Sequence, residues 1–176
     1  MELETERLLL RPWSIEDANT LLQLGSDARV GPAAGWPVLH NIDDSKKMIE
    51  YIFSCWGFFA LERKNTNELI GSVGILVGKA SNFNIADDEG EILYWLGVPY
   101  WHQGYATEAV KKIIQYGFSC LELNQIWCGY FEGNDASKKL QENCGFQYQY
   151  TIPNKVQTLA NEWHIQHVTC LKNNCL

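Results

Sequence analysis

Apolar and polar positions along the chain form two kinds of pattern. Short apolar runs bounded by charged or turn-forming residues are typical of strands. The sequence contains about seven such runs, at residues 5–11, 58–62, 69–77, 91–98, 125–131, 146–150 and 163–171. The polar turn between the second and third runs predicts that these two strands form a hairpin.

Apolar residues that recur every three or four positions predict three helices. They are expected at about residues 15–24, from residue 41 or 43 to 53, and at 103–121. A fourth, short helix is predicted at about 135–143 from the residues at its two ends. Ser14, with Asp17 three residues later, is typical of a helix start, and Asn134 is placed to cap the last helix. Gly145 is placed to end that helix. The glycines and prolines of residues 30–41 predict a loop, and residues 153–161 are expected to form a polar turn.

The order of these elements predicts the fold class. The β-α-β unit at residues 91–131 should be parallel, whereas the last strands, which lack intervening helices, should be antiparallel. We therefore expect an α/β (α+β) fold with a mixed, mostly antiparallel central sheet of about seven strands and helices on both faces. A length of 176 residues predicts one domain spanning 1–176.

Composition narrows the choice of partner. Hydrophobic residues make up 46% of the chain and charged residues 20%, which is typical of a globular protein with a core. The net charge of −7 is poorly suited to nucleic acid and better suited to a cationic partner such as an amine. Since no apolar run approaches the length of a membrane span, no membrane association is expected.

The six cysteines show neither a C-x-x-C pair nor the spacing of metal ligands. The acidic start Met1–Glu4 does not resemble a signal peptide, so we expect reduced thiols in a cytoplasmic protein. His164 and His167 are three apart on a predicted strand and should point to opposite faces. No metal site is predicted.

One stretch carries the clearest sign of a ligand. The strand at 91–98 leads through a tight loop containing Gly104 into the start of the long helix. The first turn of a helix has backbone N–H groups without partners and the positive end of the helix dipole. A glycine lets the backbone approach a bound group closely. The sequence therefore predicts that a phosphate binds at this loop.

Several segments together carry a family resemblance: Thr5–Pro12, Tyr100–Ala109, Asn134–Ser137 and Cys144–Phe146. With the order of the elements, they resemble the GCN5-related N-acetyltransferase (GNAT) superfamily. Within it, the chain is similar to the branch that includes ribosomal-protein N-terminal acetyltransferases. The resemblance covers about residues 5–150.

The resemblance implies an enzyme, an N-acetyltransferase that uses acetyl-CoA as acyl donor and no metal. It implies that the CoA pyrophosphate is held by the backbone of Gln103, Gly104, Tyr105, Ala106 and Thr107. The strand before this loop would part from the next strand, and the pantetheine arm would pair with backbone around Trp95, Leu96 and Val98. Besides capping its helix, Asn134 would either meet the pantetheine or keep the cleft open.

The sequence departs from the family pattern in three places. The acidic residue often seen near the last strand in this branch is not evident in Trp163–His167. Many members have glycine where this chain has His102, and the tyrosine that serves as general acid in other branches falls at Gln141. A side chain at position 102 is tolerated if it points away from the phosphate.

Transfer of an acetyl group to an amine needs a neutral amine and a stabilised leaving thiolate. Glu91 is the first candidate for the base, and the alternative is a solvated glutamate at the end of a strand. Ser137 is the candidate for a hydrogen bond to the departing sulfur. Its alternative role is that of a first-turn serine that satisfies a backbone N–H group.

The predicted function is transfer of acetyl from acetyl-CoA to a primary amine, by direct attack in a ternary complex. The expected acceptor is a protein N-terminal α-amine, and the alternative is a small amine such as a polyamine or an antibiotic. A hypothesis of another class is a non-catalytic acyl-CoA sensor. An exposed sheet edge also leaves a homodimer open.

Overall fold

The computed structural model describes residues 1–153 and 156–173. Residues 154–155, within the predicted polar turn, and residues 174–176, which include Cys175, lie outside the described residues. Within the described part of the chain, eight strands form one sheet in the order β1-β2-β3-β4-β5-β6-β10-β7. They are β1 (Leu3–Glu4), β2 (Leu8–Arg11), β3 (Phe58–Arg63), β4 (Leu69–Val77), β5 (Glu89–Leu96), β6 (Gln125–Phe131), β7 (Gln147–Thr151) and β10 (Gln166–Lys172).

The strand pairings confirm the predicted fold class. β5 and β6 are parallel, and the other neighbouring strands of the sheet are antiparallel. The hairpin of β3 and β4 is present as predicted. The sequence predicts one last strand at 163–171 and a polar turn at 153–161, and the structure differs in both. Val156–Gln157 (β8) and Trp163–His164 (β9) pair in a small separate ribbon, and the strand of the main sheet begins only at Gln166. Strands of two residues leave no periodic pattern by which the sequence could have shown them.

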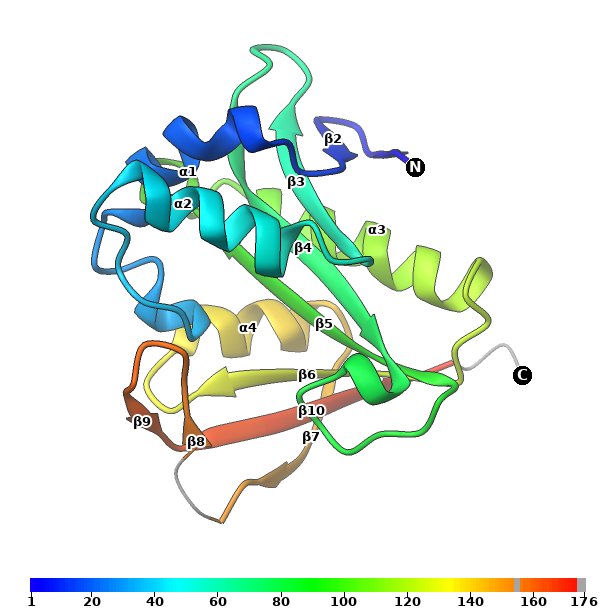
Figure 1. Ribbon diagram of the computed structural model, residues 1–176. Coiled ribbons are helices and arrows are strands. Elements are labelled where there is room, and N and C mark those ends of the chain that lie inside the picture. The colour runs from blue at the N-terminus through cyan, green and yellow to red at the C-terminus, as the bar shows by residue number, and fades with distance from the viewer. Residues whose placement is uncertain (154–155, 174–176) are drawn as a thin grey trace.

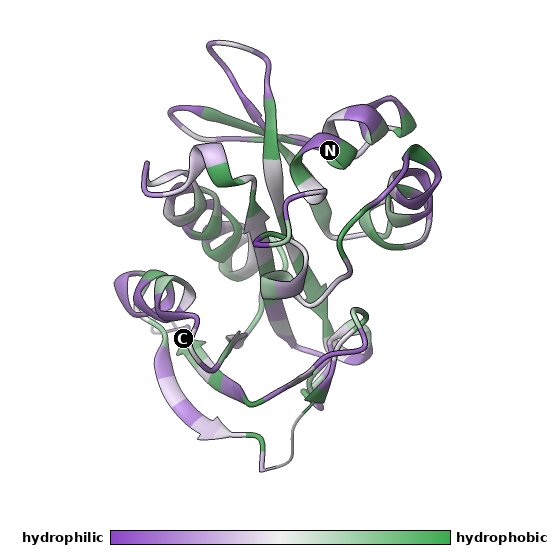
Figure 2. Ribbon diagram, turned by 90° about the vertical axis from the view of Figure 1, so that its left-hand side faces the viewer, coloured by the Kyte–Doolittle hydropathy of each residue, from purple (hydrophilic) through white to green (hydrophobic). Residues whose placement is uncertain are grey.

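Helices cover both faces of the sheet (Figures 1 and 2). They are α1 (Ala18–Gly25), α2 (Ile42–Met48), α3 (Tyr105–Ser119) and α4 (Asp135–Asn143). A 3-10 turn at Ile15–Asp17 precedes α1, and a π-helical turn at Ile49–Phe53 continues α2. In the described residues, none of these helices is long and apolar enough to cross a lipid bilayer.

The predicted caps are confirmed. Ser14 and Asp17 form a reciprocal capping box before α1, and the Asn134 side chain accepts the Ser137 backbone N–H at the start of α4. Gly145 follows α4 with φ of +91°, a conformation that glycine adopts without a steric penalty. These local signals set helix ends within one or two residues of the predicted positions.

The sheet separates two hydrophobic cores, and β5 contributes to both of them. Ile92 and Leu96 pack in the core beneath α3, whereas Trp95 packs in the aromatic core beneath α1 and α2. This alternation follows from the pleat of a strand, in which successive side chains point to opposite faces. Glu91, four residues before Trp95, therefore lies on the α1 and α2 side.

The strand predicted at 91–98 is shifted by two residues and ends at Leu96. The Gly97 N–H still donates to the Ile70 carbonyl, but Val98 begins a 3-10 turn that runs to Tyr100. Pro99 explains this end, because proline has no N–H with which to continue a ladder. The expectation that Val98 belongs to the strand is wrong.

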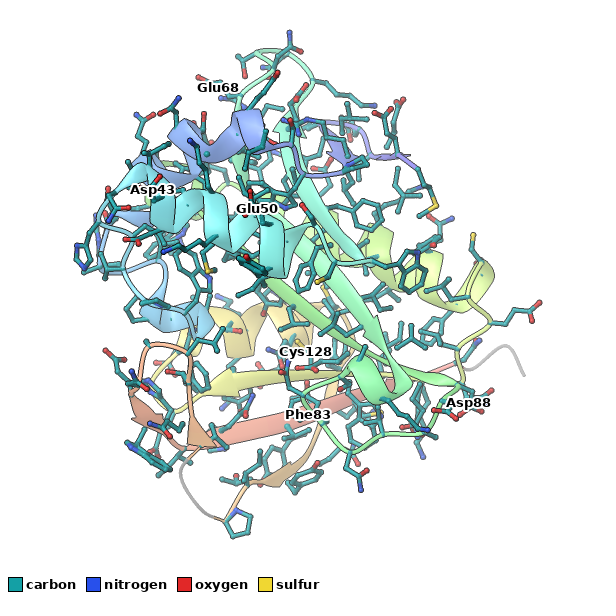
Figure 3. The ribbon with its side chains drawn as sticks, in the orientation of Figure 1. Asp43, Glu50, Glu68, Phe83, Asp88 and Cys128 are labelled. Atoms are coloured by element: carbon teal, nitrogen blue, oxygen red, sulfur yellow. The ribbon has the colours of Figure 1, made fainter. Side chains whose placement is uncertain are left out.

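β5 and β6 part halfway along their length. Their parallel pairing runs from Glu89 with Gln125 to Ile92 with Cys128 and stops there. Cys128, labelled near the centre of Figure 3, therefore marks the point at which the sheet opens. The separation of the two strands, which the family resemblance implied, is confirmed.

Candidate active site

A large cleft opens where β5 and β6 separate. Its volume is about 1760 Å³. Its walls include the second half of β5, the end of β6 and the first turns of α3 and α4. They also include the segment around residues 29–36, and β8 with the turn that follows it. The cleft therefore joins the predicted phosphate loop to both faces of the opened sheet.

The phosphate loop has the geometry that its sequence predicts. Gly104 lies immediately before α3 with φ of +82°, and a Cβ built there would have only the Arg7 guanidinium as a near neighbour, at 3.4 Å. Among the described residues, the backbone N–H groups of residues 103–107 have no acceptor. These N–H groups and the positive end of α3 suit an anion.

The predicted loop residues do not all face the cleft. Gly104, Tyr105, Ala106 and Thr107 line it, whereas Gln103 is not among the lining residues. The Gln103 side chain instead donates to the Pro99 carbonyl at 2.8 Å, which closes the turn before the helix.

His102 occupies a backbone conformation that favours glycine. Its φ is +59°, and its side chain is exposed at the cleft. A non-glycine residue in the left-handed region costs roughly 1–3 kcal/mol and persists only where the surrounding structure enforces it. The left-handed turn thus explains why glycine suits this position.

Arg7, in the N-terminal segment, contacts three residues in and after the phosphate loop. Its guanidinium donates to the Gln103 carbonyl at 3.0 Å and to Glu108 Oε2 at 2.6 Å, and it lies 4.4 Å from the centre of the Tyr105 ring. Sequence reasoning missed this role, because an isolated arginine near the N-terminus carries no signal of a partner about a hundred residues away.

The free edge of β5 presents alternate backbone groups to the opening. The Cys128 thiol donates to the Ile92 carbonyl from the β6 side, whereas a Cβ on Gly71 of β4 would lie 2.2 Å from the Trp95 carbonyl. Since backbone groups alternate along a strand, Tyr94 and Leu96 face the opening and Trp95 faces β4. The Leu96 carbonyl also accepts the Trp101 indole N–H at 2.8 Å. Val98 is not among the residues that line the cleft.

Glu91 is buried in the cleft wall rather than solvated at a strand end. Only 3% of the residue is exposed. Its Oε2 accepts the Ser81 hydroxyl at 2.8 Å and the Asn82 backbone N–H at 2.6 Å. Oε1 receives a single contact of 3.2 Å, from the Asn82 amide. Burial raises the pKa of Glu91 above the ordinary carboxyl value, and the donated hydrogen bonds offset part of that rise.

Ser137 does not satisfy a backbone N–H with its hydroxyl. Its Oγ lies 2.7 Å from the Tyr94 hydroxyl and accepts the Gln141 side-chain N–H at 3.1 Å. Tyr94 and Ser137 line the cleft on the α3 and α4 side of the sheet. Tyr94 was missed, although its place between Ile92 and Leu96 on the alternating pattern of the strand predicted the side to which it points.

The described residues offer neither a cluster of metal ligands nor, at Cys128, an activated thiol. In residues 1–153 and 156–173, His, Cys, Asp and Glu form no group of three or more that would hold a metal. The five described cysteines are free. Burial raises the pKa of the Cys128 thiol, which makes it a weak nucleophile.

A split between the parallel strands β5 and β6, beside a helix start with unpartnered N–H groups, agrees with the family to which the chain is similar. The family model described as an acetyltransferase (GNAT) domain matches residues 7–147. The chain belongs to the GNAT acetyltransferase family. It is 37% identical over 153 residues to the N-acetyltransferase p20 of Bacillus licheniformis, with 82% of each chain covered. It is 31% identical to the N-acetyltransferase YoaA of Bacillus subtilis over a stretch that also covers 82% of each.

Solved structures of the family have the same fold. A GNAT acetyltransferase from Bacillus anthracis superposes with a TM-score of 0.83 at 21% identity, covering 98% of both chains. The microcin C7 self-immunity acetyltransferase MccE, solved with acetyl-CoA and AMP, superposes with a TM-score of 0.76 at 22% identity, covering 96% of this chain and 94% of that one. This GNAT protein is therefore an N-acetyltransferase, and acetyl-CoA is its acyl donor.

The geometry fits that donor. The unpartnered N–H groups at the start of α3 suit a pyrophosphate, and the free edge of β5 suits an amide-containing arm. Beyond the last pair, Ile92 with Cys128, both strands contribute residues to the wall of the cleft.

Proposed function

We propose that this GNAT protein acetylates the α-amine of a protein N-terminus, by direct attack of the amine in a ternary complex. The observation that carries the proposal is the state of Glu91. It is a buried carboxylate in the cleft wall, with a raised pKa and one oxygen, Oε1, only weakly engaged.

The proposed acyl-donor site uses the start of α3 and the opening beside β5. Gly104, Tyr105, Ala106 and Thr107 would offer backbone N–H groups to the pyrophosphate, and Tyr94 and Leu96 would offer backbone groups to the pantetheine arm. Asn134 lies beside this track at the start of α4. When bound, acetyl-CoA supplies a thioester carbonyl carbon for attack and a thiolate as leaving group.

Glu91 is the proposed general base. The proton of the attacking amine would pass to Oε1, directly or through water, because Oε2 already accepts from Ser81 and Asn82. A carboxylate with a raised pKa is still a weak base. An α-amine, with a pKa near 8, is partly neutral at physiological pH, whereas a lysine amine has a pKa of about 10.4. This difference favours an N-terminal acceptor.

Direct attack is favoured over a covalent acetyl-enzyme. The thiols of Cys55 and Cys128, which line the cleft, donate to the backbone carbonyls of Tyr51 and Ile92 at 3.4 and 3.3 Å. An effective thiol nucleophile needs a lowered pKa or an adjacent base. Cys128 has the opposite shift.

The acceptor side of the cleft is formed by several separate segments. It is bordered by residues 29–36, the π-helical turn before Cys55, and β8 with the turn that follows it. Trp56 and Leu159 line it and are 65% exposed each. Exposed apolar side chains beside the cleft suit the side chains of the peptide residues that follow an N-terminal amine.

The test is a thiol-release assay with acetyl-CoA and matched acceptors. These are a lysine-free peptide with a free N-terminus, the same peptide blocked at its N-terminus but carrying one lysine, and a polyamine. We expect turnover with the first peptide and little with the others. Turnover confined to the lysine peptide or the polyamine would contradict the proposal, and the polyamine result would favour a small-amine enzyme.

A thermal-shift measurement with CoA tests the shared premise of a CoA site. Ligand at 100 times Kd should stabilise the fold by about 2.7 kcal/mol. Saturable CoA binding without turnover on any acceptor would favour the non-catalytic acyl-CoA sensor instead.

A further inference from the structure

Three polar side chains meet on the α4 side of the cleft. The Tyr94 hydroxyl on β5 lies 2.7 Å from Ser137 Oγ on α4. The Gln141 side-chain nitrogen, one turn further along α4, is 3.1 Å from Ser137 Oγ and 3.3 Å from the Tyr94 oxygen. Gln141 is fully buried, and Tyr94 and Ser137 line the cleft.

Two hydrogen bonds away from the cleft, to Thr169 and Gly129, fix the orientation of the Gln141 amide. Its oxygen accepts the Thr169 hydroxyl at 2.7 Å, and its nitrogen donates to the Gly129 carbonyl at 2.9 Å. One amide hydrogen is thereby used, and the second points at the two hydroxyls. Gln141 therefore acts only as a donor to Tyr94 and Ser137.

The Tyr94 and Ser137 hydroxyl groups carry two hydrogens, and their mutual contact uses only one of them. One of the two is shared within the 2.7 Å contact between Tyr94 and Ser137. Within the described chain, the other acceptor near the Tyr94 hydroxyl is the Ser137 carbonyl, at a long 3.4 Å. When Tyr94 donates to Ser137, the Ser137 hydroxyl hydrogen is free to donate to a group in the cleft.

We propose that Tyr94 is a positioning residue that aims the Ser137 hydroxyl at the sulfur of CoA, so that this hydroxyl stabilises the thiolate as it leaves. The proposal rests on the proposed use of this cleft for acetyl transfer. The bond from the amine nitrogen to the acetyl carbon forms, the carbon–sulfur bond breaks, and its electron pair stays on sulfur. The amine proton leaves on the Glu91 side, and Ser137 keeps its own proton.

The hydroxyl pair is expected to donate a hydrogen bond to the thiolate rather than transfer a proton to it, because the Tyr94 phenol is a weaker acid than a thiol. Burial raises the pKa of Tyr94 above that of an ordinary phenol, whereas a free thiol has a pKa of about 8.5. A thiolate is too weak a base to take a proton from this phenol. The position of Ser137 in the first turn of α4 adds the positive end of the helix, which also favours an anion.

The decisive measurement is the ionisation of the thiol of bound CoA, which needs no acceptor and no turnover. Thiolate has an ultraviolet absorbance that the thiol lacks, so a pH titration of the protein–CoA complex reports the pKa of the bound thiol. We expect it to lie below that of free CoA. Tyr94→Phe and Ser137→Ala should each make ionisation about tenfold less favourable, and the double variant should add little.

Kinetics give the second readout. Tyr94→Phe should lower kcat about tenfold while leaving the Kd of acetyl-CoA within about twofold, because only a leaving-group contact is lost. Ser137→Thr, which keeps a hydroxyl, should restore most of the rate that Ser137→Ala loses. Tyr148→Phe, on the exposed strand β7, is the matched control and should change neither quantity.

A bound thiol with the same pKa in Ser137→Ala, Tyr94→Phe and the unmodified protein would overturn the inference. If Tyr94→Phe does not fold, an unchanged pKa of the bound thiol in Ser137→Ala still overturns it, because the inference requires the Ser137 hydroxyl to contact the sulfur. The acceptor does not enter this titration. Suppose that the pKa of the bound CoA thiol is lowered, that Tyr94→Phe raises it again, and that N-terminal peptides are not acetylated. This result would contradict the proposed acceptor and leave the role of Tyr94 supported.

Discussion

Arg7 and Glu108 are 101 residues apart in the sequence and in direct contact in the fold. Arg7 Nε lies 2.6 Å from Glu108 Oε2, and the Arg7 backbone N–H donates to Oε1 at 2.9 Å. The same guanidinium reaches the Gln103 carbonyl. The N-terminal segment is thereby tied to the first turn of α3, where the pyrophosphate is expected to bind.

Glu108→Gln should destabilise the protein in a pH-dependent way. Burial opposes ionisation of Glu108, but hydrogen bonds from Thr5 and Arg7 outweigh it and hold its pKa below the ordinary value of 4.5. The stabilisation is therefore present above the unfolded-state pKa and is lost as the pH falls through the folded one. We expect a loss of about 1 kcal/mol at pH 7, since Arg7 is partly exposed.

Chemical denaturation at several pH values measures this effect. The difference between the variant and the unmodified protein should shrink as the pH falls toward the folded pKa of Glu108. Glu68→Gln, which breaks a partly exposed pair with Arg63, is the control and should change the stability much less. An equal loss of stability at every pH would contradict the assignment.

Gly104→Asp should abolish CoA binding. Its backbone has φ of +82°, so any side chain there is strained, and a carboxylate would also repel the pyrophosphate. Gly104→Ala carries the same backbone strain without the charge and should weaken binding much less. Calorimetric titration with CoA compares the two variants. Equal affinity in both folded variants would show that the phosphate binds elsewhere.

His102→Gly should raise the free energy of unfolding. With φ of +59°, His102 pays a conformational penalty that glycine avoids, and we expect a gain of about 1 kcal/mol, reduced by the greater freedom of glycine in the unfolded chain. His102→Val should have the opposite effect, because a β-branched residue fits this region poorly. Thermal melts of both variants decide the question. A more stable valine variant would refute the explanation.

Glu91→Gln should lower kcat about a hundredfold and leave CoA affinity almost unchanged. In the unmodified protein, activity should rise with pH as Glu91 loses its proton, with a midpoint above that of an ordinary carboxyl group because burial raises its pKa. The Glu91→Gln variant should not show this rise of activity with pH. A normal rate and an unaltered pH profile would remove Glu91 from the mechanism.

The stability of Glu91→Gln has a pH dependence of the opposite sign to that of Glu108→Gln. A raised folded pKa gives stability that is present below the unfolded pKa and lost as the pH rises through the folded one. The glutamine variant should therefore gain stability relative to the unmodified protein as the pH rises. Urea unfolding on both sides of that range measures the change.

Local patterns were enough for the helices and for most strands of the sheet, but not for the β8–β9 ribbon. The apolar periods predicted the first three helices, and the cap residues Asn134 and Gly145 predicted α4 and its ends. The glycine before α3 predicted an anion site, because the conformation of Gly104 and the free N–H groups after it are local properties of a helix start. The β-α-β order predicted the one parallel pair.

Tertiary structure decided which side chains meet. Whether Glu91 was a solvated end residue or a buried carboxylate depended on the loop that brings Ser81 and Asn82 over it. The contacts of Arg7 with Glu108 and of Tyr94 with Ser137 join residues 101 and 43 positions apart. Periodicity reports the face to which a side chain points, but its partners, its desolvation and therefore its pKa are set by segments that only folding brings together.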